Sequence, residues 1–332
     1  MQAIGGCGDF ECGTSNSPEI DNQGVHEFDS TFRNANDAGF QLVNYSKAGV
    51  SYTPVVSQAT LTGRDGLGNI LLHDGGQNAA SLIGSQFWVK RAPSLEYIIR
   101  IDGVGSAPYF AKPDGRAMNT QTYLVNWIVA QNGQPKAGAD WKNICHSPPV
   151  DPSATLGMDR FHVVLFEGDR IDAVKKVVYA VDLSWFNIGC AGAALSKQHL
   201  DGHTQGAMEL SSDFDSTLEQ RTAHLKMLAA DYCGSGVPLT VSGQKLNYTD
   251  DAGWMQYASS APVLEARWNA DGASCLNLPR VKANSSAAAR DAFPDIETAI
   301  SNACAMLGKS RPQGCQGPPG DFLGHHILSA NP

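Results

Sequence analysis

The sequence predicts an α+β protein with a β-rich, antiparallel sandwich- or barrel-like first half and a mixed α+β second half stapled by disulfides. The chain has 332 residues, of which only 17% are charged, and its 34 glycines and 17 prolines indicate many turns. Short apolar runs recur with turn signals about every 8 to 12 residues, as in sandwiches and barrels. The eight cysteines are even in number and lack a C-x-x-C spacing, which favours disulfides over a zinc site.

The first part of the chain is expected to hold most of the strands. Residues 1–37 are polar and rich in Gly, Asn and Asp, which predicts an irregular N-terminal arm. Residues 38–138 alternate between β-branched or aromatic runs and turn-forming residues, which predicts a β-rich domain. Its strands are expected in the runs GFQLVNY, SYTPVVS, ATLTG, GNILLH, SLIGSQFWVKR, LEYIIRIDGVG and TYLVNWIVAQNGQPK.

The second part mixes strands and helices. Two more strand-like runs, FHVVLFEGDRID and KKVVYAVDLSWFNIGC, are followed by a helical pattern after Gly192. We expect an α+β region over residues 139–285. Residues 286–332 are expected to form a C-terminal helix, begun by Pro294 and ended by Gly308, and a loop closed by its cysteine.

One helix is marked at both ends. Ser216 and Glu219 have the spacing of a capping box, in which each side chain satisfies a backbone amide of the other residue. Gly234 stands where a left-handed C-cap belongs. The spacing of the leucines between these marks predicts a helix of roughly four turns that ends in AADYCGSG.

Composition also narrows the partners and the compartment. The formal net charge of −9 argues against nucleic acid or an anionic membrane surface as a partner. No run approaches the ~18 apolar residues of a transmembrane helix. The N-terminus has no basic or apolar signal region, so it does not resemble an intact secretory precursor. Ile4–Cys7 loosely resembles a lipoprotein signal, which keeps a lipid anchor as an alternative.

The cysteines predict four disulfides without defining their connectivity, since eight cysteines allow 105 pairings. The pairs that sequence proximity favours are Cys7–Cys12, Cys304–Cys315, Cys145–Cys190 and Cys233–Cys275. Disulfides indicate an oxidising compartment, so we expect an extracytoplasmic protein that is periplasmic, associated with the outer membrane or secreted. The alternative is a cytosolic protein with eight buried thiols.

Residues 229–243 read AADYCGSGVPLTVSG, and residues 264–275 read LEARWNADGASC. These segments resemble the bacterial ADYC-domain family, which is named for the tetrapeptide. The matching positions are Met227, Ala230, Asp231, Tyr232, Cys233, Gly234, Thr240, Gly243, Glu265, Trp268, Asp271, Gly272, Ala273 and Cys275, with Trp141, Cys145, Phe186, Cys190 and Ala194 upstream. The resemblance is dense over about residues 141–280, so the region 139–285 is of ADYC type.

The resemblance implies an exported bacterial protein and assigns no activity. The chain departs from the family pattern at Gln198 and His224, where family members often carry cysteines. The absence of both cysteines together is what the loss of one disulfide would leave. The family cysteines are therefore expected to be structural.

Two alternatives exist for Cys233. As a thiolate it would be a catalytic nucleophile, with Asp231 and His224 as further candidate catalytic residues. A helix C-terminus has negative dipole character, however, and raises a thiol pKa. A half-cystine is therefore the favoured interpretation. We expect Asp231 to accept hydrogen bonds from the Gly-Ser-Gly amides or from Arg267, and Tyr232 to be buried with its hydroxyl donated.

Metal sites are the next candidates. His199 and His203 are four residues apart, which on a helix gives one metal-binding face, but Gly202 argues against a helix there. Asp213, Asp215 and Glu219 form an acidic cluster that suits a helix N-terminus or, alternatively, calcium. No cofactor is expected.

The sequence therefore predicts a binding or structural module of the cell envelope with an unknown protein or glycan partner. The alternative is an extracytoplasmic hydrolase that uses Cys233 or a His/Asp site near residues 199–224, with or without a metal. Most tryptophans are expected in the core, and some are candidates for a sugar-binding platform. The six positions are Trp88, Trp127, Trp141, Trp185, Trp254 and Trp268.

Overall fold

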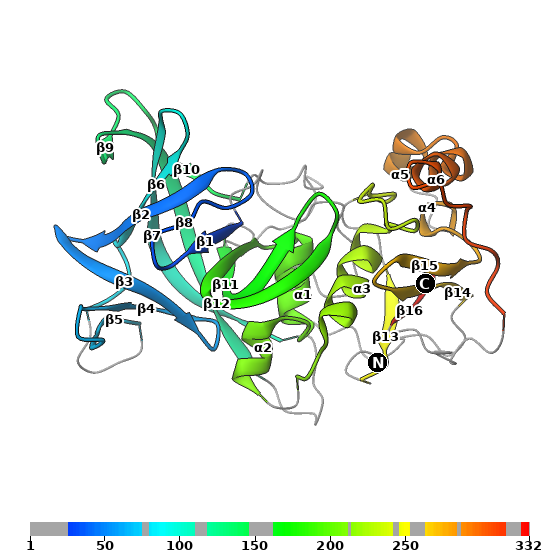
Figure 1. Ribbon diagram of the computed structural model, residues 1–332, viewed down its shortest axis with the longest axis horizontal. Coiled ribbons are helices and arrows are strands. Elements are labelled where there is room, and N and C mark those ends of the chain that lie inside the picture. Colours follow the sequence, from blue (N-terminus) through cyan, green and yellow to red (C-terminus); the bar gives the residue numbers. More distant parts are fainter. Residues whose placement is uncertain are drawn as a thin grey trace.

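The structure is a computed structural model that describes residues 26–74, 80–109, 118–145, 162–211, 214–241, 246–252, 263–283, 287–316 and 327–331. A twelve-stranded and a four-stranded sheet lie at opposite ends of the molecule, with helices between them and beside the smaller sheet (Figure 1). All strand ladders are antiparallel. The predicted α+β class with a β-rich first half is confirmed. The division of the chain into four parts stays a prediction.

The large sheet has the strand order β1-β12-β11-β8-β7-β6-β2-β3-β4-β5, and β9 and β10 also pair with β8. Its strands are β1 (Glu27–Asp29), β2 (Phe40–Lys47), β3 (Val50–Ser57), β4 (Thr60–Arg64), β5 (Ile70–Leu72), β6 (Gln86–Arg91), β7 (Leu95–Pro108), β8 (Asn119–Gln131), β9 (Gln134–Pro135), β10 (Lys142–Asn143), β11 (His162–Asp172) and β12 (Val177–Cys190). Most connections are hairpins, as expected from runs separated by Gly, Asn and Asp.

The large sheet curls on itself. The backbone amides of Gln58 and Ala59, in the turn between β3 and β4, donate to the carboxylate of Glu167 on β11 at 2.6 and 3.2 Å. The Leu61 amide donates to the Tyr123 hydroxyl on β8 at 2.9 Å. The curled sheet encloses a core of apolar side chains that includes Leu42, Tyr45, Phe87, Ile99, Val125 and Leu165. This enclosure gives the predicted barrel-like character.

Strand β11 belongs to two cores at once. Val163 and Leu165 face the interior of the curled sheet, whereas Val164 and Phe166 pack in the core under the helices. Successive side chains of a strand point to opposite faces, so a strand buried on both faces reads as a continuous apolar run. The run HVVLF has this pattern.

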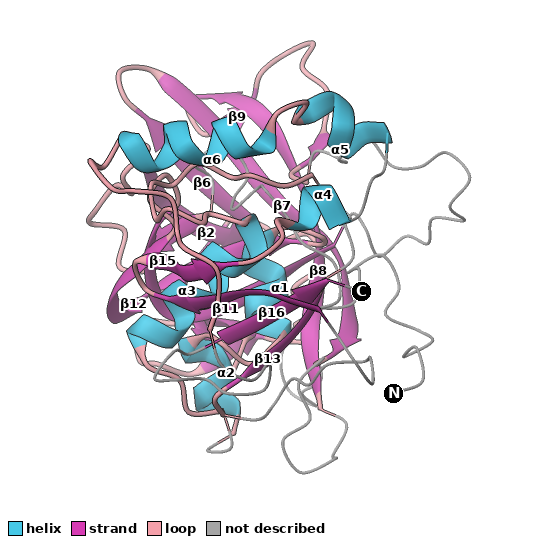
Figure 2. Ribbon diagram, turned by 90° about the vertical axis from the view of Figure 1, so that its right-hand side faces the viewer, coloured by secondary structure: helices cyan, strands magenta, loops and turns pink. Residues whose placement is uncertain are grey.

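The helices and the small sheet form the rest of the molecule. They are α1 (Ala194–Leu200), α2 (Gln205–Leu210), α3 (Leu218–Ala229), α4 (Arg280–Ala283), α5 (Ala287–Ala292), α6 (Ile296–Ala305), β13 (Asn247–Asp250), β14 (Val263–Asn269), β15 (Gly272–Leu276) and β16 (Ile327–Asn331). The small sheet has the order β13-β16-β14-β15. Seen from its own side, it lies in front of α3, and α6 crosses above it (Figure 2).

Helix α3 is enclosed between the two sheets, and its residues from Arg221 to Ala229 are all buried. It begins one residue later than the predicted capping box: the reciprocal pair is Thr217 with Gln220, at 3.2 and 2.7 Å. Ser216 accepts a hydrogen bond from Arg221 instead, which removes it from the cap. The left-handed C-cap is Ala230, with φ of +52°, and not Gly234.

The disulfides correct the predicted pairing in two places. Cys145 is joined to Cys190, as predicted. Cys233 is joined to Cys304 and not to Cys275, because the turn after α3 faces helix α6. Cys275 is joined to Cys315 and not to Cys304, because the C-terminal segment runs beside β15, where the Leu276 amide donates to the Gln313 carbonyl at 2.8 Å. These are the Cys pairs of the part of the chain that is described.

Residues 1–25 lie outside the described residues, so the predicted pair Cys7–Cys12 and the alternative lipid anchor remain untested. The three disulfides indicate a protein of an oxidising compartment outside the cytoplasm. None of the helices in the described ranges is long and apolar enough to cross a membrane.

Candidate functional site

The segment Ala230–Cys233 forms a structural joint after α3. Asp231 is fully buried, and its carboxylate accepts from Lys226 Nζ at 3.1 Å and from the Gly236 amide at 2.8 Å. The Gly236 amide belongs to the predicted Gly-Ser-Gly turn. Arg267, the alternative partner, has its Nη1 3.6 Å from the sulfur of Cys275. Asp231 thus holds the turn through an ion pair and a backbone hydrogen bond.

Tyr232 fastens the same turn to the small sheet. Its hydroxyl donates to Glu265 Oε1 at 2.6 Å, and its ring stacks on Trp268 with 5.4 Å between centroids. Glu265 also accepts from Arg280 Nε at 2.8 Å and, through Oε2, from Ser329 at 2.8 Å. All five side chains are buried. Burial and the adjacent Glu265 carboxylate raise the pKa of the Tyr232 phenol, so it serves as a donor. The predicted role of Tyr232 is confirmed.

Two glycines allow the joint to close. The Ala273 amide donates to the Tyr232 carbonyl at 2.9 Å, which brings two turns into backbone contact. A Cβ on Gly272 would lie 2.6 Å from the Gly234 nitrogen, and Gly272 has φ of +109°. A side chain at either glycine would separate the turns. Cys233, bonded to Cys304, adds α6 to the joint.

Tyr232, Glu265, Trp268 and Gly272 of the quoted segments therefore meet in one buried structural unit. The ADYC domain matches residues 79–282. The chain belongs to the ADYC domain family. The ADYC domain runs from the segment before β6 into α4, so it includes strands of both sheets and helix α3. No curated protein and no solved structure shows a significant match to the chain.

Two histidines of the ADYC domain, His203 and His224, form a closed polar cluster rather than an open site. His203 Nε2 lies 3.3 Å from Asp250 Oδ2, and His224 Nε2 lies 3.1 Å from Asp201 Oδ2. The two imidazoles stack at 4.5 Å, and His224 also lies 3.2 Å from the Tyr248 hydroxyl. This His203/His224 cluster joins the end of α1, helix α3 and strand β13.

Burial controls the protonation of this cluster. Desolvation raises the pKa of Asp201 to about 7, although the Tyr248 hydrogen bond and the charges of His203 and Lys197 oppose that change. Desolvation also lowers the pKa of His224 well below its usual value, with the charge of His203 acting in the same direction. The side chains are no more than 2% exposed. Because its side chains are buried, the cluster is closed to solvent in this arrangement.

His199 lies in a separate environment. It is 2.9 Å from the Tyr109 hydroxyl and 2.8 Å from Thr204 Oγ1, and it stacks on Phe166 at 5.0 Å between centroids. Helix α1 ends at Leu200, and the following turn directs His203 elsewhere, so the two histidines do not share a helical face. Burial lowers the pKa of His199 to about 3. Sequence spacing alone did not reveal this separation.

Among the described residues, no group of three or more His, Cys, Asp or Glu side chains has metal-binding geometry. Of the acidic cluster, Glu219 lies in the first turn of α3, as expected for a residue that complements the helix dipole. Asp213 lies outside the described residues.

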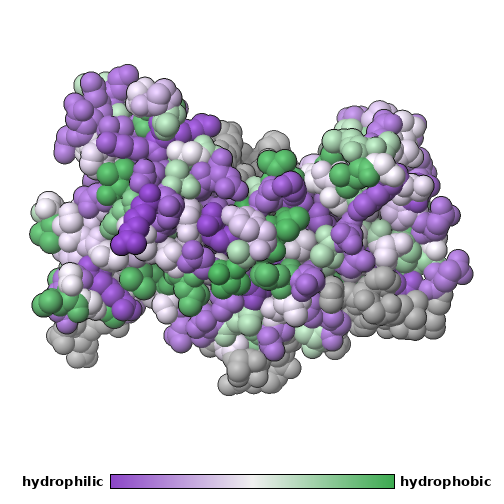
Figure 3. All heavy atoms as spheres, in the orientation of Figure 1, coloured by the Kyte–Doolittle hydropathy of each residue, from purple (hydrophilic) through white to green (hydrophobic). Residues whose placement is uncertain are grey.

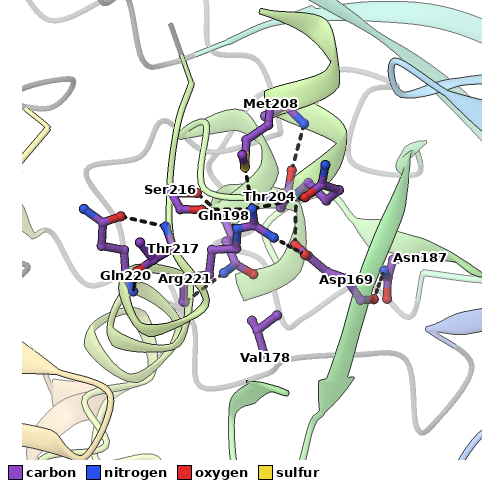
Figure 4. Close-up of polar contacts among 12 residues, drawn as sticks. Asp169, Val178, Asn187, Gln198, Thr204, Met208, Ser216, Thr217, Gln220 and Arg221 are labelled. Atoms are coloured by element: carbon purple, nitrogen blue, oxygen red, sulfur yellow. Dashed lines mark hydrogen bonds and ion pairs between the residues drawn. The ribbon is translucent and has the colours of Figure 1, made fainter. Parts of the chain in front are cut away.

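A second buried polar network attaches α2 and α3 to the large sheet (Figure 4). Arg221 Nη1 donates to Asp169 Oδ1, and its other nitrogens reach the Ser216 hydroxyl and carbonyl at 3.1 and 2.9 Å. Asp169 also accepts from the Gln205 amide at 3.1 Å. Gln198 donates to the Arg221 carbonyl at 2.8 Å, so α1 contacts α3 at one of the two positions that depart from the family pattern.

An open site lies on the outer face of the large sheet. Trp88 stands between Phe87 and Val89, whose side chains are in the barrel core, so its own side chain points outward. A cleft of about 450 Å³ lies beside it, within the usual range for small-molecule sites. We call it the Trp88 cleft. Its lining residues are Asn44, Ser46, Lys47, Ala48, Gly49, Ser51, Gln86, Trp88, Ile98, Asn132, Gly133 and Gln134.

Two hairpins form the walls of the Trp88 cleft. One wall is the β2–β3 turn, and the other is the Asn132–Gly133 turn between β8 and β9. Both residues of the second turn have positive φ, which matches the two-residue hairpin geometry. The Gly133 amide donates to Glu96 at 2.9 Å, and a Cβ there would lie 3.4 Å from the Trp88 ring. The strand register brings this turn and Trp88 together, although they are far apart in the sequence.

Proposed function

We propose that this protein is an exported bacterial envelope or surface protein whose ADYC domain is a binding module, with the Trp88 cleft as its ligand site. One observation carries the proposal: the cleft is open and concave, and the β2–β3 and β8–β9 hairpins border it. The ADYC joint and the His203/His224 cluster, in contrast, are buried. Cys233 is a half-cystine, so it offers no thiolate. The Trp88 cleft is therefore proposed as a site that binds a ligand.

The disulfides support this proposal. They fasten the strands and turns that carry both cores, as in other proteins that work in oxidising compartments. Figure 3 shows mostly hydrophilic residues where β2, β6 and β9 lie, which suits a surface that meets a polar ligand.

The test is co-sedimentation of the purified protein with isolated bacterial envelopes. Ser51 is an exposed residue of the cleft wall, so Ser51→Trp fills the cleft without disturbing a core. We expect the wild type to sediment and Ser51→Trp to stay in the supernatant. Ser57→Trp, at an exposed position on the same strand but outside the cleft, is the control and should sediment. Equal retention of Ser51→Trp and wild type would refute the proposal.

A further inference from the structure

We infer that the ligand of the Trp88 cleft is a neutral oligosaccharide. This inference rests on the proposed function and adds the chemical class of the ligand. It follows from three properties of the cleft: unused carboxamide groups, an almost complete lack of free charge, and a polar row that continues along the sheet beside an indole ring.

The carboxamides are the first property. Four of them line the cleft, those of Asn44, Gln86, Asn132 and Gln134. Within the described residues none of the four makes a side-chain hydrogen bond, whereas the buried carboxamides of Asn187 and Gln198 do. A carboxamide both donates and accepts, as sugar hydroxyls do. The cleft therefore offers paired hydrogen-bonding capacity that the protein does not use.

Charge is the second property. Lys47 is the sole charged residue among those that line the cleft, and its Nζ donates to the Ser81 carbonyl. Nearby Arg100 is held by Asp102, with Nη2 3.1 Å from Oδ2. Lys90 lies beside the cleft, with its Nζ 4.5 Å from the centroid of the Trp88 ring and 3.8 Å from Glu96 Oε1. Anionic ligands are usually recognised by several unpaired Arg or Lys groups, whereas Lys47, Lys90 and Arg100 each have a partner here. The lining is also too polar for a lipid. A neutral, hydroxyl-rich ligand remains.

The third property is the row that leaves the cleft. Ser46, Gln86, Arg100 and Asn126 are direct cross-strand partners on β2, β6, β7 and β8. Cross-strand partners share one face, and strands are about 4.8 Å apart, so these side chains form a polar line across the sheet. Trp88 lies on the neighbouring row, where Lys90 Nζ lies 4.5 Å from the centroid of its ring. A line of this kind fits a chain of sugars rather than a single ring.

The experiment is isothermal titration calorimetry of the full chain with short neutral oligosaccharides, namely glucans, mannans, galactans and N-acetylhexosamine oligomers, and with their sulfated counterparts. We expect at least one neutral series to bind, and sulfation not to tighten it. Gln86→Ala and Asn132→Ala should each weaken binding about tenfold, as for a lost hydrogen bond. Asn302→Ala, an exposed amide deletion on α6, is the matched control and should bind like wild type.

Different results separate the two proposals. If cleft-dependent retention on envelopes is abolished by protease and survives periodate oxidation, the ligand is a protein; the glycan inference is then overturned while the binding function stands. Oligosaccharide binding that Gln86→Ala and Asn132→Ala leave unchanged also overturns the inference. If Ser51→Trp is retained like wild type, the cleft is not the site and both proposals fail. Thermal unfolding of each variant shows whether it is folded.

Discussion

At the scale of single residues, Glu265 is the hub of the ADYC joint. Its carboxylate is fully buried and serves Tyr232, Arg280 and Ser329 together. A buried charge with several partners contributes little net free energy while it is complete, but removing one partner leaves the others desolvated without compensation. Glu265 therefore has a structural role in the motif, because its removal would leave buried polar partners without compensation.

Glu265→Ala should lower the free energy of unfolding by about 3 to 5 kcal/mol, because the buried Arg280 guanidinium loses its carboxylate. Tyr232→Phe should cost about 1 to 2 kcal/mol. Urea unfolding near neutral pH measures both. Lys282→Ala, which breaks the exposed ion pair with Glu297, is the control and should cost less than about 1 kcal/mol. A Glu265→Ala cost no larger than that of Lys282→Ala would contradict the hub role.

Gly272→Ala should destabilise the fold far more than another glycine with positive φ. A Cβ at Gly272 would meet the backbone of Gly234 and Tyr232, whereas Gly68, with φ of +87°, has nothing within 4 Å. We expect about 1 kcal/mol for Gly68→Ala from backbone strain alone, and at least about 3 kcal/mol for Gly272→Ala. Chemical denaturation distinguishes them, and similar costs would show that the two turns can move apart.

At the scale of elements, the buried ionisable side chains of α1 and of the turn after it make stability depend on pH. The folded state disfavours protonated His199, whose pKa falls to about 3 from the usual 6.5. Below pH 6.5 the unfolded chain therefore binds more protons, and stability falls as the pH falls. Asp201 acts in the opposite direction. Its pKa rises to about 7, so the folded state holds a proton between pH 3.8 and 7 and loses stability as the pH rises through that range.

His199→Gln should remove the contribution of this imidazole to the pH dependence of the free energy of unfolding. The stability of wild type minus that of His199→Gln should decline by up to about 1.4 kcal/mol per pH unit as the pH falls from 6.5 towards 3. Asp201→Asn provides the counterpart of opposite sign: wild type minus Asp201→Asn should decline as the pH rises from 4 to 7. Urea unfolding at a series of pH values tests both. Parallel curves for wild type and His199→Gln would rule out a neutral buried imidazole.

At the scale of the whole molecule, the disulfides connect distant parts of the chain. Cys233–Cys304 closes a separation of 71 residues and fastens α6 to the ADYC joint. Replacing both cysteines by alanine should cost about 2 to 4 kcal/mol. Guanidinium unfolding without reductant measures this cost. Non-reducing peptide mapping should recover Cys233 with Cys304 and Cys275 with Cys315, and a Cys233–Cys275 peptide would contradict the connectivity.

The sequence predicted the features that depend on local pattern. The runs of alternating and β-branched residues located the large-sheet strands, and the cysteine count indicated disulfides. The motif AADYCGSG identified the family. The capping box was misplaced by one residue because Ser216 and Thr217 are both good caps, and only the contact between Ser216 and Arg221 decides between them.

Features that depend on contacts between residues far apart in the chain could not be predicted from the sequence. Cys233 pairs with Cys304 because α6 crosses the turn after α3, and no local spacing encodes that crossing. The Trp88 cleft joins residues of five strands and two turns whose proximity follows from register. The buried charges of α3 likewise find their partners across the chain, as Arg221 finds Asp169.

The shared strand β11 has a consequence for engineering and for divergence. Val163 and Leu165 are constrained by the volume of the barrel, and Val164 and Phe166 by the volume available beneath the helices. Neighbouring codons thus evolve under separate volume limits. The barrel interior can be repacked through the odd positions of this run while the helical layer keeps its side chains, and a one-residue insertion here would exchange the two sets and disrupt both cores at once.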